Sequence, residues 1–141
     1  KKGISSNKKE GDLKTPRGKF LLESVFYRSD RIKKIQTKLK LKIIKPNMGW
    51  CDDPSSKKYN HLIKLPFKYS YENLYRKSRL YDIIIVIGYN RKNIKKRKGS
   101  AIFLHLATKN FKPTHGCIAV SKTVMLNVLK HAEKKTKIII Q

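Results

Sequence analysis

The chain has 141 residues, and its 35 Lys and Arg residues outnumber its 9 Asp and Glu residues, which gives a formal net charge of +26. Hydrophobic residues make up 39% of the chain and charged residues 31%, which excludes a collagen-like, low-complexity or wholly disordered protein. The two cysteines exclude a disulfide framework, and no apolar run approaches the roughly 18 residues of a membrane span.

The length predicts one domain over residues 1–141, and its first 60 residues contain one clear strand. Residues 1–18 are polar and rich in turn-forming residues, so we expect a loop. Residues 19–28 carry aromatic and β-favouring side chains and predict a strand. Residues 31–45 fit either a strand or a short helix, and residues 46–60 are loop-like in composition.

The middle of the chain predicts a buried strand followed by an exposed basic loop. Residues 62–67 indicate a short extended piece broken by a proline, and residues 72–79 indicate one or two helical turns. Residues 81–89 form an unbroken apolar run rich in Ile and Val, which is typical of a strand buried on both faces. Residues 91–99 read as the basic loop.

The last 40 residues predict two strands around one helix. Residues 100–106 resemble a second buried strand, and residues 107–116 are irregular. Ser121 is a good N-cap, and apolar residues recur at helical spacing from there to about residue 135. Residues 137–141 predict a final strand, so the fold class is mainly β with one helix near the end.

The basic charge would attract polyanions, such as nucleic acid or an anionic polymer of the cell envelope. Most of the basic residues are lysine and they are scattered along the chain, whereas nucleic-acid readers favour arginine. Abundant Lys and Ile fit AT-rich codon usage, so dispersed, solvated surface charge is a sufficient explanation. We therefore expect no dedicated nucleic-acid partner.

Residues 100–121 hold the side chains that are suited to nucleophilic catalysis. Cys117 could supply a thiolate, and His105 could supply the base that makes it. Gly116 allows close backbone approach, so the N–H groups around Gly116 and Cys117 could form an oxyanion hole. The positive end of the following helix could stabilise a thiolate if it points there.

Two other interpretations of these residues stay open from the sequence alone. A free cysteine is often a small buried hydrophobe, and a histidine on an apolar strand is often a core residue. A metal site could use His61, His105, His115 and Cys117, but paired ligand spacing is lacking, so we expect no metal and no cofactor.

Thr114-His115-Gly116-Cys117, after a strand that ends in His105, resembles the signature of the L,D-transpeptidase catalytic domain family, also called YkuD-like. That signature is a His, an intervening loop and then Ser or Thr-His-Gly-Cys. Residues 10–20 (EGDLKTPRGKF) resemble the family's early "EGD-x-KTP-x-G-x-F" segment. Residues 49–54 with Tyr59-Asn60, and residues 86–90, are similar to segments of a compact bacterial subgroup.

The resemblance implies a β-sandwich or barrel in which a helix follows the catalytic cysteine. It implies that Cys117 attacks the carbonyl between a diamino acid and the terminal D-amino acid of a peptidoglycan stem peptide, forming a thioester. His105 would move the proton, and the carbonyl of Leu106 would orient its ring. Thr114 and His115 would shape the pocket beside Gly116.

The resemblance leaves the acyl acceptor open. An amine of a second stem would make a crosslink, as an L,D-transpeptidase does, and water would shorten the stem, as an L,D-carboxypeptidase does. The chain departs from the family pattern in two places. The spacing from His105 to Cys117 is 12 residues, which is shorter than is usual in the larger crosslinking members. Ile118-Ala119-Val120 stands where many members carry a polar Arg or Asn that helps to hold substrate. A rival hypothesis is a non-catalytic wall-binding or polyanion-binding module on the same fold.

Other residues receive weaker predictions. Trp50 is expected to pack or line the groove beside an unpaired Cys51. Tyr89 and Asn90 end a strand where a loop can line a site, but Tyr89 fits a packing role better, and Asn90 fits a turn as well as a site. The resemblance implies peptidoglycan stem peptides as partners and a place in the bacterial cell envelope or periplasm, with no export signal visible in this chain. We expect a monomer without a transmembrane segment.

Overall fold

The computed structural model describes residues 2–141, which form three sheets and one α-helix. The strands are β1 (Ile4–Ser5), β2 (Thr15–Pro16), β3 (Gly18–Tyr27), β4 (Lys40–Ile43), β5 (Met48–Cys51), β6 (Leu62–Lys64), β7 (Tyr71–Asn73), β8 (Ile83–Ile87), β9 (Phe103–Leu106), β10 (Ile118–Val120) and β11 (Lys137–Ile140). The helices are the short 3₁₀ helix η1 (Arg79–Tyr81) and the α-helix α1 (Lys122–His131). The predicted mainly β fold with one helix after Cys117 is therefore confirmed.

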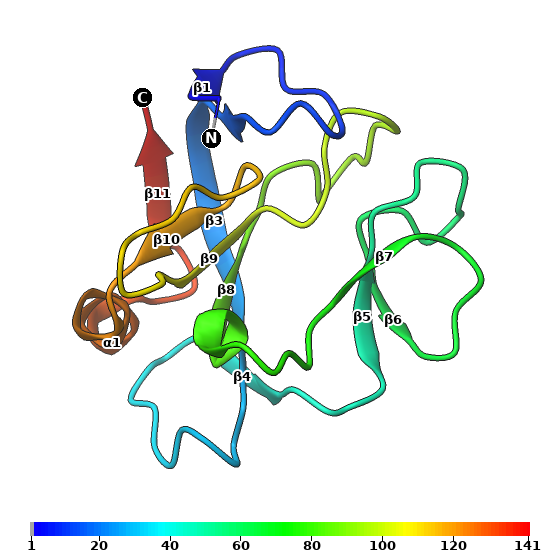
Figure 1. Cartoon of the computed structure of the whole chain (residues 1–141). Helices are drawn as coiled ribbons and strands as arrows, with labels where there is room; N and C mark the ends of the chain where they lie inside the picture. The colour runs from blue at the N-terminus through cyan, green and yellow to red at the C-terminus, as the bar shows by residue number, and fades with distance from the viewer. Residues whose placement is uncertain (1) are drawn as a thin grey trace.

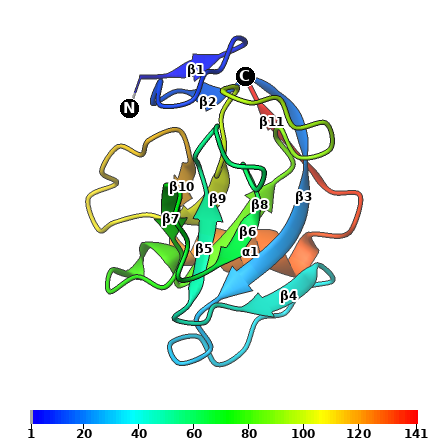
Figure 2. The same cartoon turned by 90° about the vertical axis from the view of Figure 1, so that its right-hand side faces the viewer.

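The largest sheet has six strands and runs through the middle of the molecule. Its order is β10-β9-β8-β3-β11, and β4 pairs with β3 alongside this path. Helix α1 covers one side of this sheet and the three-stranded sheet β6-β5-β7 lies on the other side, as Figure 1 shows. Figure 2 looks onto the small sheet in front of β8 and β9, with α1 behind them.

Strand β8 explains why the core has two halves. All five of its residues are buried, as the apolar run predicted. Because successive side chains of a strand point to opposite faces, Ile83 and Ile85 pack with Met125 of α1, whereas Ile84 packs with Trp50 of the small sheet. One strand thereby joins both layers.

The small sheet corrects two predictions. Residues 46–60 contain β5, which is the central strand of that sheet, and residues 72–79 contain the end of β7 and no α-helical turn. Loop-like composition misled the prediction, since Gly49 is needed for packing and not for a turn. A Cβ on Gly49 would lie 2.8 Å from Ile63 and 2.9 Å from Tyr71 on the flanking strands.

The ends of the chain also differ in detail from the sequence prediction. The expected N-terminal loop contains β1 and β2, which pair in parallel. Helix α1 begins after the predicted cap, because the Ser121 side chain accepts a hydrogen bond from the Val124 N–H at 3.2 Å, but the helix ends at His131 rather than near residue 135. Strand β10 separates Cys117 from α1, so the cysteine does not adjoin the start of the helix. Within residues 2–141, no helix is both long and apolar enough to cross a membrane.

Candidate active site

A cavity of about 480 Å³ contains both residues that the sequence singled out for catalysis. His105 and Cys117 line it together with Thr114 and His115. Its remaining walls come from several distant segments of the chain. They include Glu10, Gly11, Leu13, Asp52, Glu72, Arg76, Leu80, Tyr81, Ser100, Ala101, Thr108, Lys112, Pro113 and Ala119.

Parallel pairing of β9 and β10 brings the cysteine beside the histidine strand. Ile118 pairs with Leu104 and Ala119 pairs with His105, so Cys117 enters the sheet next to the start of β9. The Phe103 N–H points to the Cys117 Sγ at 3.5 Å, and the sulfur lies 3.2 Å from the Ala101 carbonyl oxygen, to which it donates. Two backbone groups therefore fix the sulfur atom.

The surroundings of Cys117 favour the neutral thiol. Burial raises the pKa of Cys117 to about 12, although the N–H of Phe103 acts in the opposite direction. Loss of hydration disfavours the charged form of any thiol, and here it outweighs the one donor that contacts the sulfur. The resting site therefore holds a thiol, and a thiolate forms only when a base removes its proton.

His105 is buried in β9 with one ring nitrogen already engaged. Its Nδ1 lies 2.8 Å from the carbonyl oxygen of Leu106, and since a carbonyl only accepts, Nδ1 carries the proton. Burial lowers the pKa of His105, so the imidazole is neutral near pH 7 and Nε2 holds a free lone pair. Leu106 thus orients the ring, as the family resemblance implied.

Three side chains behind His105 were missed by the sequence analysis. The Tyr81 ring meets the His105 ring edge-on with centroids 5.4 Å apart, and its hydroxyl donates to Glu72 Oε1 at 2.8 Å. Arg76 forms an ion pair with the same carboxylate and lies 4.3 Å above the Tyr81 ring. Glu72 and Arg76 come from residues 72–79, for which the sequence predicted helical turns, and Tyr81 ends η1 where the sequence predicted the start of a strand.

The early motif segment, residues 10–20, lies against the cysteine loop, residues 114–117. Glu10 and Gly11 line the cavity, and a Cβ on Gly116 would lie only 2.6 Å from the carbonyl oxygen of Lys14. Gly116 also has a φ of +112°, which L side chains rarely adopt. Only glycine fits this crossing of two segments that are about 100 residues apart in the sequence.

The cysteine loop is held by a hydrogen bond from its own Thr114 side chain. The Thr114 hydroxyl donates to the Cys117 carbonyl oxygen at 2.6 Å, which closes the turn before β10. His115 is exposed at the cavity wall. Thr114 therefore contributes to the shape of the loop as well as to the lining.

Three residues predicted to line the groove lie elsewhere. Trp50 is buried in the core and donates from Nε1 to Asn60 Oδ1 at 2.9 Å. The Tyr89 hydroxyl donates to a backbone carbonyl of the basic loop, and the Asn90 amide donates to the Gly99 carbonyl at 2.8 Å. None of the three lines the cavity of Cys117, so their role as binding residues is not supported.

Cys51 and Cys117 are both free, and Cys51 is fully buried, in agreement with the expected unpaired Cys51. Among the residues that the structure describes, no group of three or more His, Cys, Asp or Glu side chains is placed to hold a metal ion.

A second, more open cavity of about 540 Å³ also reaches Cys117. Thr114, Cys117 and Ala119 line both cavities, and the rest of the second one is largely apolar. Its other walls include Ile4, Phe111, Ile118, Ile138, Ile139 and Ile140. The cysteine therefore lies where two cavities meet.

Comparison with known proteins gives one match. The family model described as the L,D-transpeptidase catalytic domain (YkuD) matches residues 2–140, nearly the whole chain. No curated protein and no solved structure matches significantly.

Proposed function

Because the chain belongs to the L,D-transpeptidase catalytic domain family, which acts on peptidoglycan, we propose that it is a cysteine-dependent L,D-transpeptidase with Cys117 as nucleophile and His105 as base. The observation that carries this proposal is the single cavity that both side chains line. His105 is held by Leu106 through Nδ1, so its free nitrogen is Nε2, the atom that a base needs. Residues 1–141 would act as one catalytic domain in the cell envelope.

In the proposed first step, the thiol proton of Cys117 leaves only as the carbon–sulfur bond forms. The thiol has a pKa of about 12 and the pKa of His105 is lowered by burial, so a resting thiolate–imidazolium pair is unfavourable. Nε2 would accept the thiol proton while Sγ attacks the carbonyl carbon of the diamino acid. The N–H groups of Gly116 and Cys117 are our candidates to stabilise the oxyanion.

The second step would release the terminal D-amino acid. The carbon–nitrogen bond breaks, His105 returns its proton to the leaving amine, and a thioester on Cys117 remains. The amine of a second stem then attacks the thioester carbon and loses a proton to His105. The carbon–sulfur bond breaks, and His105 returns that proton to Sγ, which regenerates the thiol. The second cavity supports transfer to an amine, because it offers another peptide access to Cys117 from a different side.

Arg76 is our candidate for contact with a substrate carboxylate. Ala119 stands in the segment where many family members carry a polar residue, and it lines the cavity without offering charge. Arg76 brings a guanidinium to the same cavity, fixed by its ion pair with Glu72 and by the Tyr81 ring. Guanidinium groups bind carboxylates through two parallel hydrogen bonds.

A carbapenem tests the proposed nucleophile, because it acylates such a thiol without any acceptor. Mass spectrometry is expected to show a one-to-one adduct on the wild-type protein at Cys117 and none on the Cys117→Ala variant. The Cys51→Ala variant is the matched control and is expected to form the adduct. A wild-type protein that forms no adduct, or an equal adduct on Cys117→Ala, would contradict the proposal.

The reaction products decide between transfer and hydrolysis. We expect purified enzyme incubated with tetrapeptide stems to yield crosslinked dimers, detected as muropeptides by mass spectrometry. Tripeptides without dimers would instead identify a carboxypeptidase that uses water. Binding to cell walls that is unchanged in Cys117→Ala, with no product from the wild type, would identify a non-catalytic binding module.

A further inference from the structure

Three carboxylates line the cavity of Cys117, and two of them accept hydrogen bonds through one oxygen each. Glu10 accepts hydrogen bonds from the hydroxyls of Tyr59 and Ser100, the latter at 2.7 Å. Glu72 binds Tyr81 and Arg76 as described above. The third carboxylate, Asp52, is different because its Oδ1 atom is buried and has no hydrogen-bond partner within residues 2–141.

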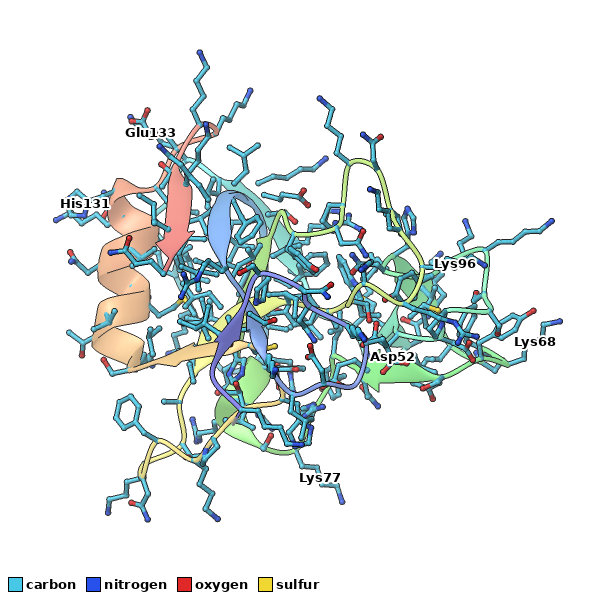
Figure 3. All side chains as sticks on the ribbon, turned by 90° about the horizontal axis from the view of Figure 1, so that it is seen from above. Asp52, Lys68, Lys77, Lys96, His131 and Glu133 are labelled. Atoms are coloured by element: carbon cyan, nitrogen blue, oxygen red, sulfur yellow. The ribbon has the colours of Figure 1, made fainter. Side chains whose placement is uncertain are left out.

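Asp52 is held in place by the strand that precedes it. It directly follows β5, and its backbone N–H donates to the Ser70 carbonyl at 3.3 Å. The next residue, Asp53, directs its carboxylate elsewhere and accepts hydrogen bonds from the Ser55 N–H and hydroxyl at 2.8 and 2.6 Å. In Figure 3, seen from above, Asp52 lies well inside the outline of the molecule, whereas Lys68 and Lys77 extend from its edge.

A buried carboxylate oxygen without a donor is costly, so its presence calls for a physical reason. The fold supplies no donor to this oxygen, although the chain has 35 Lys and Arg residues. Asp52 also lines the cavity, so a rotation of its carboxylate would turn this oxygen toward a ligand there, and the ligand can supply the donor. Because the group is a carboxylate, its best ligand partner is a cation, which makes a charge-assisted hydrogen bond.

The proposed reaction brings such a cation to this cavity. The carbonyl that Cys117 would attack belongs to the diamino acid of the stem, so the side chain of that same residue must lie close to the site. That side chain carries a free amino group, which is an ammonium near pH 7 and, in meso-diaminopimelic acid, stands beside a carboxylate on the same carbon. We propose, on the basis of the function proposed above, that Asp52 binds the side-chain ammonium of the donor stem's diamino acid.

The test compares two donor substrates on matched variants. One is a tetrapeptide stem that ends in meso-diaminopimelic acid and D-alanine, and the other is the same stem with its side-chain amine acetylated. Both are assayed with the same excess of a tripeptide stem, whose free side-chain amine serves as acyl acceptor and which carries no D-alanine to release. The released D-alanine gives kcat/KM for each. We expect the wild type to prefer the free amine by about 10- to 100-fold, the range of one hydrogen bond to a charged group. Asp52→Asn is expected to reduce this preference to near unity, and Asp53→Asn to retain it.

The thermal midpoint separates binding from a structural role. Asp52→Asn removes no hydrogen bond from Oδ1 and is expected to melt no lower than the wild type, whereas Asp53→Asn loses charge-assisted acceptors and is expected to melt lower. A preference that survives in Asp52→Asn, or is absent from the wild type, would overturn the assignment of Asp52 while the proposed function stands. Release of D-alanine from neither stem by the wild type would overturn both.

Discussion

The crossing of Gly116 and Lys14 makes a stability test of the candidate site possible. In Gly116→Ala the new Cβ would lie 2.6 Å from the Lys14 carbonyl oxygen, so the backbone must move by roughly half an ångström or more to restore an ordinary contact. The φ of +112° adds backbone strain for any L side chain. Strain of about 1–2 kcal/mol and overpacking of about 1–3 kcal/mol together predict a loss of about 2–5 kcal/mol in the free energy of unfolding.

The matched control is Gly11→Ala in the same N-terminal segment. Gly11 also has a positive φ, of +71°, but a Cβ there would meet nothing within 4 Å. Only the strain of about 1–2 kcal/mol is therefore expected.

Thermal or urea unfolding of the two variants measures the difference. Each kcal/mol shifts the midpoint of a chain of this size by about 3–4 °C, so Gly116→Ala is expected to melt roughly 6–20 °C below the wild type. It is also expected to lose reactivity of Cys117 toward a carbapenem, because the cysteine loop must shift. A Gly116→Ala variant as stable as Gly11→Ala would refute the close packing of the early segment on the cysteine loop.

Three further predictions concern the histidine and the side chains that support the site. Burial lowers the pKa of His105, and only the neutral ring accepts a proton. We therefore expect kcat/KM to stay constant as the pH falls to about 6.5 and to decline only below that pH. A decline that begins above pH 6.5 in the pH–rate profile would contradict this. Asn60 Oδ1 accepts hydrogen bonds from Trp50 Nε1 at 2.9 Å and from a backbone N–H at 3.1 Å. Asn60→Ala would leave both donors unpaired, so urea unfolding is expected to show a loss of about 2–5 kcal/mol in the free energy of unfolding. A double-mutant cycle of Glu72→Gln and Tyr81→Phe is expected to give a coupling free energy of about 1–2 kcal/mol, and a value near zero would show that this hydrogen bond does not stabilise the fold.

The orphaned oxygen of Asp52 and the neutral thiol of Cys117 illustrate the same property of the cavity. Both groups would be more stable with partners that the fold does not provide. Active sites commonly keep such unfavourable arrangements because substrate supplies the missing interaction. A substrate that brings a cation and an electrophilic carbonyl would satisfy both groups at once.

Local patterns in the sequence were sufficient to predict strands β3, β8, β9 and β11 and the helix. The apolar run of β8 and the N-cap at Ser121 fix structure through neighbours in the chain, so both were predicted correctly. The candidate pair His105 and Cys117 followed from chemistry and from the resemblance, because each side chain lies in a recognisable local motif. The prediction that Leu106 orients the imidazole was possible for the same reason, since the contact is between adjacent residues.

Tertiary structure decided which distant segments complete the site. The sequence predicted a loop for the residues of β5 because of their loop-like composition. In the structure, Gly49 is required by close packing of the flanking strands, a constraint that composition does not express. The sequence left open whether Trp50 and Tyr89 pack or line the groove, and the tertiary structure buries the first in the core and directs the hydroxyl of the second to a loop. Asp52 and Arg76 reach the cavity only because the small sheet packs against the large one. Long-range packing of this kind depends on the whole chain, so it could not be read from any single segment.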